Sequence, residues 1–422
     1  MRDGLDGGAA LITAPTPAVL PPTPAGGSDP MSAVPPSAPT LEDVARVAGV
    51  SRATVSRVVN GKRQVAPNLP EVVRRAVLDT GYVPNLAARS LVTRRTGTVA
   101  VVVSGAEDAA KGGAIDFADP FFGRAVGGLL RALRPHEVDP ILMIAETRND
   151  RARVMSVLHS GNADGALLVS THADDPLPAM LVQAGMPAVM FARPSARLPI
   201  SFVDVANRDG AALAAQHLSA RGRHRVAVIS GPLDVPAAAD RLTGFQDAMA
   251  RLGHPYLPAA HGNFTYSSGI LAMNRLLDQD PGIDGVFACN DLMALGAIQA
   301  LHAHGRLVPD DVSVIGFDDS SVASVSRPAL TTIRQPIQEM TVEMVRILLE
   351  SLAQPDRRPR SVILEPALIL RASTWPRRAP ATPTPTPIGS SGRGALRTDG
   401  DGRPLGRGRP PRWIVDRVGQ PV

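Results

Sequence analysis

Seven short apolar segments between Gly97 and Ser373 constrain the fold more than any other feature of this 422-residue sequence. They are TVAVVV, DPILMIA, DGALLV, PAVMF, RVAVIS, DGVFAC and VSVIGF. Valine, isoleucine and leucine follow one another in these segments without alternating with polar residues, and helical patterns separate them. Strands of this kind are buried on both faces, as in parallel sheets that helices cover on either side. The sequence therefore predicts a parallel α/β core, and its length suits two such lobes.

A pair of short helices is predicted ahead of this core, in the segment LEDVARVAGVSRATVSRVVNG at residues 41–61. Thr40 can cap the first helix with Asp43 in capping-box position, and Gly49 can end it. Ser51 can cap the second helix, whose valines recur at i, i+3 and i+4 and so face inward. The opposite face carries Arg, Ser and Asn side chains, which suit a helix that enters the major groove of DNA. An ordinary pair of surface helices is the alternative interpretation.

The segment from Thr40 to Arg95 resembles the headpiece of the lactose-repressor (LacI/GalR) family. The motifs that carry the resemblance are TLEDVARVAGVS, ATVSRVVNG and YVPNLAARSL, and the resemblance continues to about Thr374. In that family the second helix lies in the major groove, and the segment around YxPN forms a hinge helix that puts a leucine into the minor groove. Leu91 matches that leucine, and an apolar wedge beside arginines is what kinking at the minor groove requires. A core position for Leu91 is the alternative.

The exposed positions of the second helix and the family resemblance together give the predicted DNA-binding residues. They are Thr40, Ser51, Arg52, Ala53, Thr54, Ser56, Arg57, Asn60, Tyr82, Asn85, Ala88, Arg89 and Leu91. Charge is distributed accordingly, because residues 40–96 contain ten Lys/Arg and four Asp/Glu, whereas residues 97–375 contain 24 and 29. A basic head on an acidic body is typical of a DNA-binding protein.

Residues 97–375 resemble the periplasmic-binding-protein-like core of the same family, whose two lobes close on a small ligand. DPFFGRAVGGL, GPLDVPAAADRLTGF and CNDLMALGAIQAL match its ligand-binding loops. Arg241 and Asp291 match the family's ligand-binding arginine and aspartate, and a guanidinium that donates beside a carboxylate that accepts suits a polyol. The predicted effector-binding residues are Phe121, Phe122, Arg193, Arg241, Phe264 and Asp291. Core packing of the phenylalanines and a structural Arg241–Asp291 ion pair are the alternatives.

Composition and alignment to the family's motifs divide the chain. Residues 1–39 and the basic tail 376–422 are rich in Pro, Ala, Gly, Thr and Ser, so both are predicted to be disordered. Between them the predicted parts are the helix-turn-helix headpiece at 40–84, the hinge helix and linker at 85–96, and the effector-binding and dimerisation core at 97–375. Within the core, lobe one is predicted at about 97–205 plus 307–337 and lobe two at about 206–306 plus 338–375.

Several classes of protein are disfavoured. Cys289 is the only cysteine, so an internal disulfide is impossible and a reducing cytoplasm is the natural location. The sequence contains no run of eighteen apolar residues that could span a membrane. It also lacks a P-loop, a nucleophile elbow and any spacing of metal ligands. We therefore expect no enzymatic activity, no metal, no cofactor and no membrane association.

A ligand-gated transcriptional regulator accounts for the head, the hinge and the cleft together. The resemblance implies a repressor that binds a palindromic operator in double-stranded DNA and is controlled allosterically by a small molecule, a sugar or sugar derivative. No leucine heptad follows Arg371, so a homodimer is expected rather than a tetramer. A cytosolic sugar-binding or sensor protein and a transcriptional activator of the same architecture are the alternatives, and the effector can be either an inducer or a co-repressor.

Overall fold

The computed structural model describes residues 39–59, 66–83, 95–105, 119–170 and 172–375. The chain divides into two compact units, Met1–Asn85 and Leu86–Val422. The predicted disordered ends and the predicted hinge helix lie almost wholly outside the described residues. So do five of the predicted DNA-binding residues: Asn60, Asn85, Ala88, Arg89 and Leu91.

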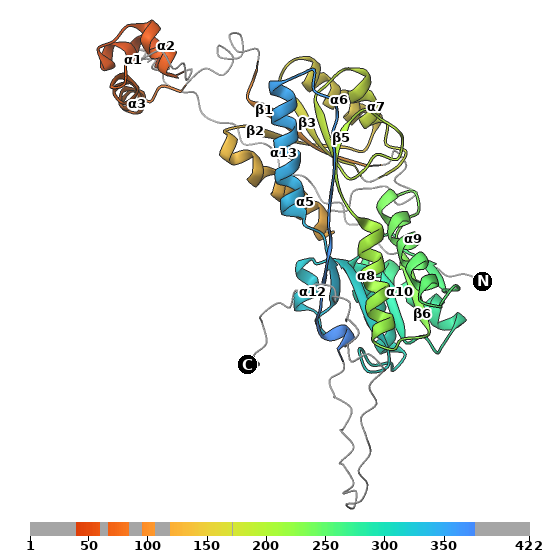
Figure 1. Ribbon diagram of the computed structural model, residues 1–422. Helices are drawn as coiled ribbons and strands as arrows, with labels where there is room; N and C mark the ends of the chain where they lie inside the picture. Colours follow the sequence, from red (N-terminus) through yellow and green to blue (C-terminus); the bar gives the residue numbers. More distant parts are fainter. Residues whose placement is uncertain (1–38, 60–65, 84–94, 106–118, 171, 376–422) are drawn as a thin grey trace, which may run out of the picture. The chain divides into compact units, whose positions relative to one another are not determined.

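The described residues of the first unit, 39–59 and 66–83, form three helices (Figure 1). They are α1 (Leu41–Ala48), α2 (Arg52–Val59) and α3 (Leu69–Thr80). One small apolar cluster joins them, with Val44, Val55 and Val73 fully buried at its centre, one from each helix. Because each helix contributes one buried valine, none of the three can bury its apolar face without the other two.

The predicted caps of the first two helices are confirmed. The hydroxyl of Thr40 accepts from the backbone N–H of Asp43 at 3.4 Å, and the Asp43 carboxylate accepts from the Thr40 N–H at 3.0 Å. This reciprocal capping box, led by the Thr40 N–H, lowers the pKa of Asp43 to about 2. Gly49 ends α1 with a φ of 65°. Ser51 accepts from the N–H of Thr54 at 3.2 Å at the start of α2.

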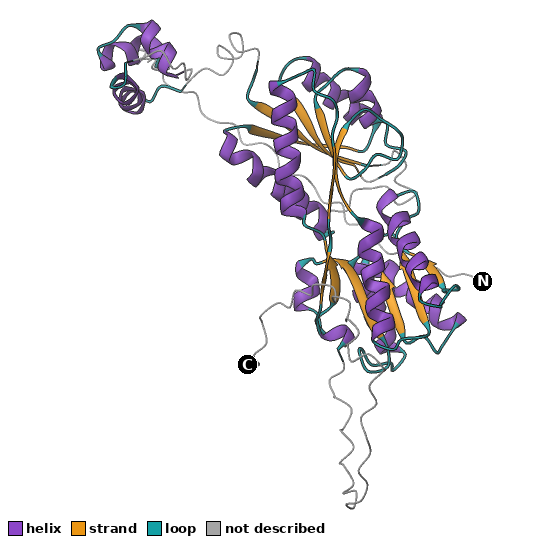
Figure 2. Ribbon diagram, in the orientation of Figure 1, coloured by secondary structure: helices purple, strands orange, loops and turns teal. Residues whose placement is uncertain are grey.

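In the second unit, the residues that the structure describes form two six-stranded sheets (Figure 2). In the first lobe the strand order is β11-β5-β4-β3-β1-β2 and every pair is parallel. Its strands are β1 (Thr98–Ser104), β2 (Asp139–Ala145), β3 (Gly165–Ser170), β4 (Ala188–Phe191), β5 (Ser201–Val205) and β11 (Ser361–Leu364).

The second lobe has the order β12-β10-β9-β8-β6-β7, with β12 antiparallel to β10 and the other pairs parallel. Its strands are β6 (Val226–Ser230), β7 (Ala259–His261), β8 (Gly285–Ala288), β9 (Ser313–Asp318), β10 (Thr331–Arg334) and β12 (Ala367–Ile369). All seven predicted apolar segments form strands, which confirms the parallel α/β core.

Helices cover both faces of the first sheet. Val99 and Val101 of β1 face α5 (Pro120–Leu133) and α13 (Ile337–Ala353), whereas Ala100 and Val102 face α6 (Arg148–His159) and α7 (Leu177–Gln183). The helices of this lobe are α5 (Pro120–Leu133), the 3-10 turn Arg134–His136, α6 (Arg148–His159), α7 (Leu177–Gln183) and α13 (Ile337–Ala353). Those of the second lobe are α8 (Asn207–Ala220), α9 (Pro236–Arg251), α10 (Tyr266–Gln279), α11 (Asp291–Ala303), α12 (Ser321–Val325) and the 3-10 turn Ala372–Thr374.

The predicted division of the core between the lobes is wrong for β9, β10, α13 and β11. Residues 307–337 are predicted in lobe one, but β9 and β10 pair within the second sheet. Residues 338–375 are predicted in lobe two, which is wrong for α13, since it packs on the first sheet, and for β11, since it pairs with β5. The prediction is confirmed for β12, which pairs with β10 in the second sheet. Since β9 follows β8 through the single helix α11, the strand-helix-strand unit closes within one sheet. The chain therefore crosses between the lobes after β5, after β10 and after β11.

A glycine allows α10 and α11 to pack closely in the second lobe. A Cβ atom added at Gly296 would overlap the backbone carbonyl oxygen of Tyr266 and would lie 2.8 Å from the backbone nitrogen of Ile270. Backbone atoms of a packed helix cannot rotate away as a flexible side chain can. The two helices must therefore move apart if this position carries a side chain.

We predict that Gly296→Ala lowers the free energy of unfolding by about 1 to 3 kcal/mol, because the added methyl group overpacks the helix crossing. Urea unfolding followed by circular dichroism measures the change. Gly123→Ala on α5 is the matched control, since a Cβ there meets nothing within 4 Å. The control should leave stability unchanged or raise it by up to about 1 kcal/mol through helix propensity. Equal losses in the two variants would contradict the close crossing.

Candidate functional site

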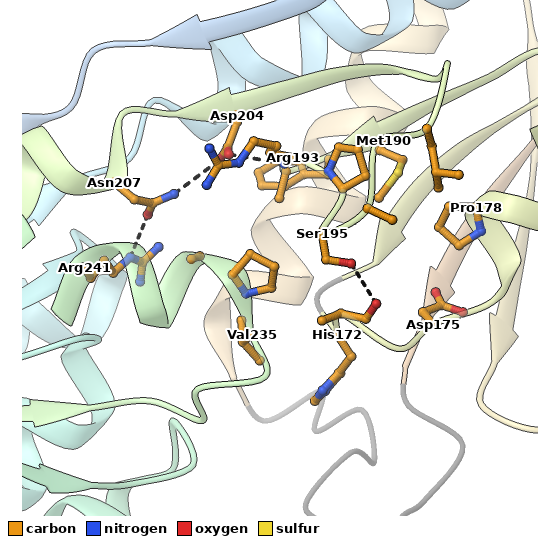
Figure 3. A pocket seen from close by; sticks show the side chains of 18 of the residues that line it. His172, Asp175, Pro178, Met190, Arg193, Ser195, Asp204, Asn207, Val235 and Arg241 are labelled. Carbon is orange, nitrogen blue, oxygen red and sulfur yellow. Dashed lines mark hydrogen bonds between the residues drawn. The ribbon is translucent and has the colours of Figure 1, made fainter. Parts of the chain in front are cut away.

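A cavity of about 140 Å³ lies between the two lobes of the second unit (Figure 3). One wall consists of loops that follow strands β3 and β4 of the first lobe, and the other comes from the start of α9 in the second lobe. Much of its lining is apolar: Phe121, Pro178, Met190, Phe191, Leu198, Val235 and Pro236. Its polar lining residues are His172, Asp175, Arg193, Ser195, Asp204, Asn207, Arg241 and Gln335.

A chain of hydrogen bonds at one side of the cavity links the two lobes (Figure 3). Nε of Arg241 donates to Oδ1 of Asn207 at 2.8 Å, and Nδ2 of Asn207 donates to Oδ1 of Asp204 at 3.3 Å. Asp204 lies in β5 and Asn207 begins α8, so the chain follows the first crossing between the lobes. Burial raises the pKa of Asp204, and Arg193 and Arg241 partly oppose the rise.

The guanidinium of Arg241 is 5% exposed and is held on several sides. Nη1 donates to the carbonyl oxygen of Cys289 at 2.7 Å and lies 3.5 Å from Oδ1 of Asp318. The guanidinium carbon lies 3.7 Å from the centroid of the Phe317 ring, within the range of a cation–π interaction. Burial raises the pKa of Asp318, and the charge of Arg241 opposes the rise. The predicted effector arginine is therefore fixed with its guanidinium at the cavity.

Asp291 does not pair with Arg241, and it is not among the residues that line the cavity. Its Oδ2 accepts from the N–H of Ser320 at 2.7 Å and from the Ser320 hydroxyl at 2.8 Å, and its Oδ1 accepts from the Thr332 hydroxyl at 2.5 Å. Both carboxylate oxygens are thus occupied within the second lobe. The alternative of a structural Arg241–Asp291 ion pair is wrong, since Asp318 is the carboxylate beside Arg241. A contact between Asp291 and an effector stays a prediction.

The predicted aromatic residues occupy different places. Phe121 lines the cavity, and its ring centroid lies 5.3 Å from that of Phe122 and 5.4 Å from that of Phe191, both edge to face. Phe122 packs against the core of the first lobe. Phe264 packs against the core of the second lobe, with its ring over Gly231. Phe121 is therefore the one of the three predicted phenylalanines that borders the cavity.

Three polar residues of the network around Arg241 are absent from the sequence-based prediction: Asp204, Asn207 and Asp318. The polar lining residues His172, Asp175, Ser195 and Gln335 are absent from it as well. Asp318 directly follows the apolar segment VSVIGF and is the last residue of β9, so it lies at the carboxyl end of a parallel strand, where open α/β sheets bind ligands. That position is a signal that the sequence already contains. Asp204 lies in β5 and Asn207 follows it, and the apolar runs miss this strand because a serine and an aspartate are among its five residues.

The predicted DNA-reading face of α2 is exposed in the first unit. Arg52, Ala53 and Arg57 are exposed, whereas Thr54 and Ser56 are half-buried. Nε of Arg52 lies 2.9 Å from the carboxylate of Glu42 in α1, which fixes the position of this arginine at the start of α2. Tyr82 is half-buried against the cluster that joins the three helices.

Comparison with known proteins decides the family. The model of bacterial regulatory proteins, lacI family, matches residues 40–85, and that of a periplasmic binding protein-like domain matches residues 215–374. The HTH-type transcriptional regulator CelR of Thermobifida fusca is 44% identical over 339 residues, which cover 79% of this chain and 98% of the relative. The chain belongs to the LacI family. The ribose operon repressor of Escherichia coli (strain K12) is 33% identical over 341 residues, covering 79% of this chain and 99% of the repressor.

Solved structures of this family have the same architecture. The transcriptional regulator CelR–cellobiose complex matches with a TM-score of 0.61 and 42% identity, covering 79% of this chain and 99% of that chain. The lac repressor dimer bound to operator and the anti-inducer ONPF matches with a TM-score of 0.66 and 26% identity, covering 80% and 99%. These LacI-family relatives are transcriptional regulators, and the protein is a DNA-binding regulator of the same family.

Neither a membrane span nor a metal site is found in the part of the chain that the structure describes. No helix there combines the length and the apolar character needed to cross a lipid bilayer. No three His, Cys, Asp or Glu side chains in the same ranges are grouped so that they could hold a metal ion.

We predict that Asp291→Asn lowers the free energy of unfolding by about 1 to 3 kcal/mol at pH 7. An amide has one acceptor oxygen, so it cannot serve both Ser320 and Thr332, and a buried donor loses its partner. Thermal and urea unfolding measure the loss. Asp278→Asn on the exposed surface of α10 is the control and should change stability by less than about 0.5 kcal/mol. An Asp291→Asn protein as stable as this control would mean that the carboxylate does not brace the second lobe.

Proposed function

We propose that this protein is a homodimeric repressor that binds a palindromic operator and changes its DNA affinity when a β-linked glucose disaccharide of the cellobiose class enters the inter-lobe cavity. The similarity over nearly the whole length of CelR, whose solved complex contains cellobiose, carries this proposal. A regulator of this kind acts in the bacterial cytoplasm, binds its effector without converting it and needs no cofactor.

The exposed face of α2 supports the proposal on the DNA side. A helix whose outward side chains include Arg52 and Arg57 can place guanidinium groups against the O6 and N7 atoms of guanine. The small Ala53 between them allows the helix to approach the base edges. An inverted repeat is the natural target, because a twofold-symmetric dimer presents two such helices to two half-sites.

The composition of the cavity supports a carbohydrate effector. A sugar ring presents apolar C–H groups on its faces and hydroxyl groups around its edge. Phe121 provides apolar lining, while Arg241, Asn207 and Asp204 provide donors and acceptors. Small-molecule sites usually obtain their specificity from a small number of precisely placed polar groups in a mostly apolar pocket.

Control of DNA binding follows from thermodynamic linkage. If the effector binds one degree of lobe closure better than another, and if the operator also prefers one of them, each ligand changes the affinity of the other by the same factor. A sugar that prefers the DNA-free arrangement acts as an inducer, and one that prefers the DNA-bound arrangement acts as a co-repressor.

Titration calorimetry followed by DNA binding tests the proposed function. The full-length protein is titrated with cellobiose, ribose and lactose, and operator affinity is then measured by fluorescence anisotropy with and without the sugar that binds. Selection from a random DNA library supplies the operator. Micromolar binding of cellobiose together with a tenfold or larger change in operator affinity is the expected result. Absence of sugar binding, or sugar binding that leaves operator affinity unchanged, contradicts the proposal.

For DNA reading, we predict that Arg57→Ala relaxes base preference at one position of each half-site by about 1 to 3 kcal/mol, because arginine reads guanine through O6 and N7. Quantitative binding to a set of single-base operator variants measures the preference. Arg74→Ala on α3 is the control, since this arginine is exposed and pairs with Glu71 on its own helix. A uniform loss on all DNA sequences would make Arg57 a phosphate contact instead.

For effector binding, we predict that Arg241→Ala weakens cellobiose binding at least tenfold, since a charge-assisted hydrogen bond to a buried hydroxyl contributes about 1.5 to 3 kcal/mol. Operator affinity without sugar should stay within about twofold of the parent. Arg241→Lys keeps a positive charge near Asp318 and should fold even if the alanine variant does not. Arg251→Ala at the exposed end of α9 serves as the control. If the lysine variant and a folded alanine variant both bind the sugar as tightly as the parent, Arg241 does not contact the sugar.

A further inference from the structure

The carboxylate of Asp240 joins the two lobes at the edge of the cavity. Asp240 lies on α9 of the second lobe, and its Oδ2 pairs with Nη2 of Arg193, which follows β4 in the first lobe. Its other oxygen, Oδ1, lies 3.1 Å from Nε of Arg208, at the start of α8. The two oxygens thus hold one arginine from each lobe.

A second contact between the lobes has the same polarity. Nδ1 of His172, in the loop after β3, lies 3.1 Å from Oδ2 of Asp234, in the loop before α9. The backbone N–H of Ala173 donates to the carbonyl oxygen of Asp234 at 3.0 Å. In both places the first lobe supplies the donor and the second lobe supplies the acceptor. The two lobes are therefore joined by complementary groups on either side of the start of α9.

Asp240 is not required by the proposed sugar site. It is absent from the residues that line the cavity, whereas its partner Arg193 belongs to them. The cavity measures about 140 Å³, and pockets that hold small ligands usually measure about 300 to 1,000 Å³. A disaccharide therefore needs the lobes to separate before it can enter, and the Arg193–Asp240 contact opposes that separation.

We propose that Arg193 and Asp240 form an ionic latch that keeps the cleft closed in the absence of effector, with Arg208 positioning the carboxylate. The latch must break when the lobes part, which frees the Arg193 guanidinium for an entering ligand. Asp240 is thus a positioning residue of the switch rather than a ligand contact. This inference rests on the proposed function for its purpose, but the contact itself is tested without any effector.

Energy transfer between the lobes measures the latch directly. Ser156 on α6 and Gln216 on α8 are exposed, so Ser156→Cys and Gln216→Cys place one dye on each lobe. The native Cys289 is fully buried and does not compete for the dyes. The labelled full-length protein is diluted into an excess of unlabelled protein, so that the signal comes from single chains. Transfer is recorded from 0.1 to 1 M NaCl, over which the screening length falls from about 10 Å to about 3 Å.

We expect Asp240→Asn to lower the closed-to-open ratio about two- to fivefold at 0.1 M NaCl, as for a partly exposed ion pair. As the salt concentration rises, the closed-to-open ratio of the parent should fall by a similar factor, and that of Asp240→Asn should change little. Arg193→Gln should lower the closed-to-open ratio by the same factor as Asp240→Asn. The double variant should lower it no further, because both changes remove the same interaction. Asp247→Asn, on the same helix and 3.8 Å from Arg208, is the matched control and should behave as the parent.

Two results would overturn the latch. One is an Asp240→Asn protein with the transfer and salt response of Asp247→Asn. The other is a double variant whose effect is the sum of the two single ones, which would mean that Arg193 and Asp240 act independently. Adding cellobiose to the same labelled protein then tests the proposed function separately. If the energy transfer responds to salt as expected but does not respond to cellobiose, the latch is supported and cellobiose is rejected as the effector.

Discussion

The buried guanidinium of Arg241 is the interaction on which the geometry of the cleft depends. A positive charge that is almost fully removed from water must be matched by acceptors on each of its donors, or it costs several kcal/mol. Arg241 therefore fixes its acceptors: Asn207 at the first crossing, the Cys289 carbonyl at the end of β8 and Asp318 at the end of β9. Three chain segments far apart in sequence meet around one side chain.

The network also involves the strands that connect the lobes. Asp204 and Asn207 flank the first crossing, and Gln335, just after β10, donates to the carboxylate of Asp318 at the second. These polar groups of the cavity thus lie on the segments that connect the lobes. An effector bound as proposed would act on those segments directly, and hinge closure of lobes around a ligand is one of the usual structural routes to allosteric control.

Local features of the fold could be predicted from the sequence, and long-range ones could not. Apolar runs revealed seven strands, and Thr40, Gly49 and Ser51 marked helix ends, because those signals lie within a few residues of each other. The path of the chain between the lobes depends on which sheet accepts β9, α13 and β11, and no local pattern in them records it. Arg241 could be found by motif, but Asp318 rather than Asp291 became its partner, since Ser320 and Thr332 occupy both oxygens of Asp291.

The late position of α13 and β11 has a consequence for synthesis of the protein on the ribosome. The first lobe begins near Thr98, yet one face of its sheet packs against Met340, Met344 and Leu348 of α13, which emerge more than 200 residues later. The second lobe's β6 to β10 are complete before that helix appears. A nascent chain therefore carries an apolar sheet face that only α5 covers while the second lobe is being synthesised. Protection of that face by chaperones matters more here than in a protein whose lobes are contiguous.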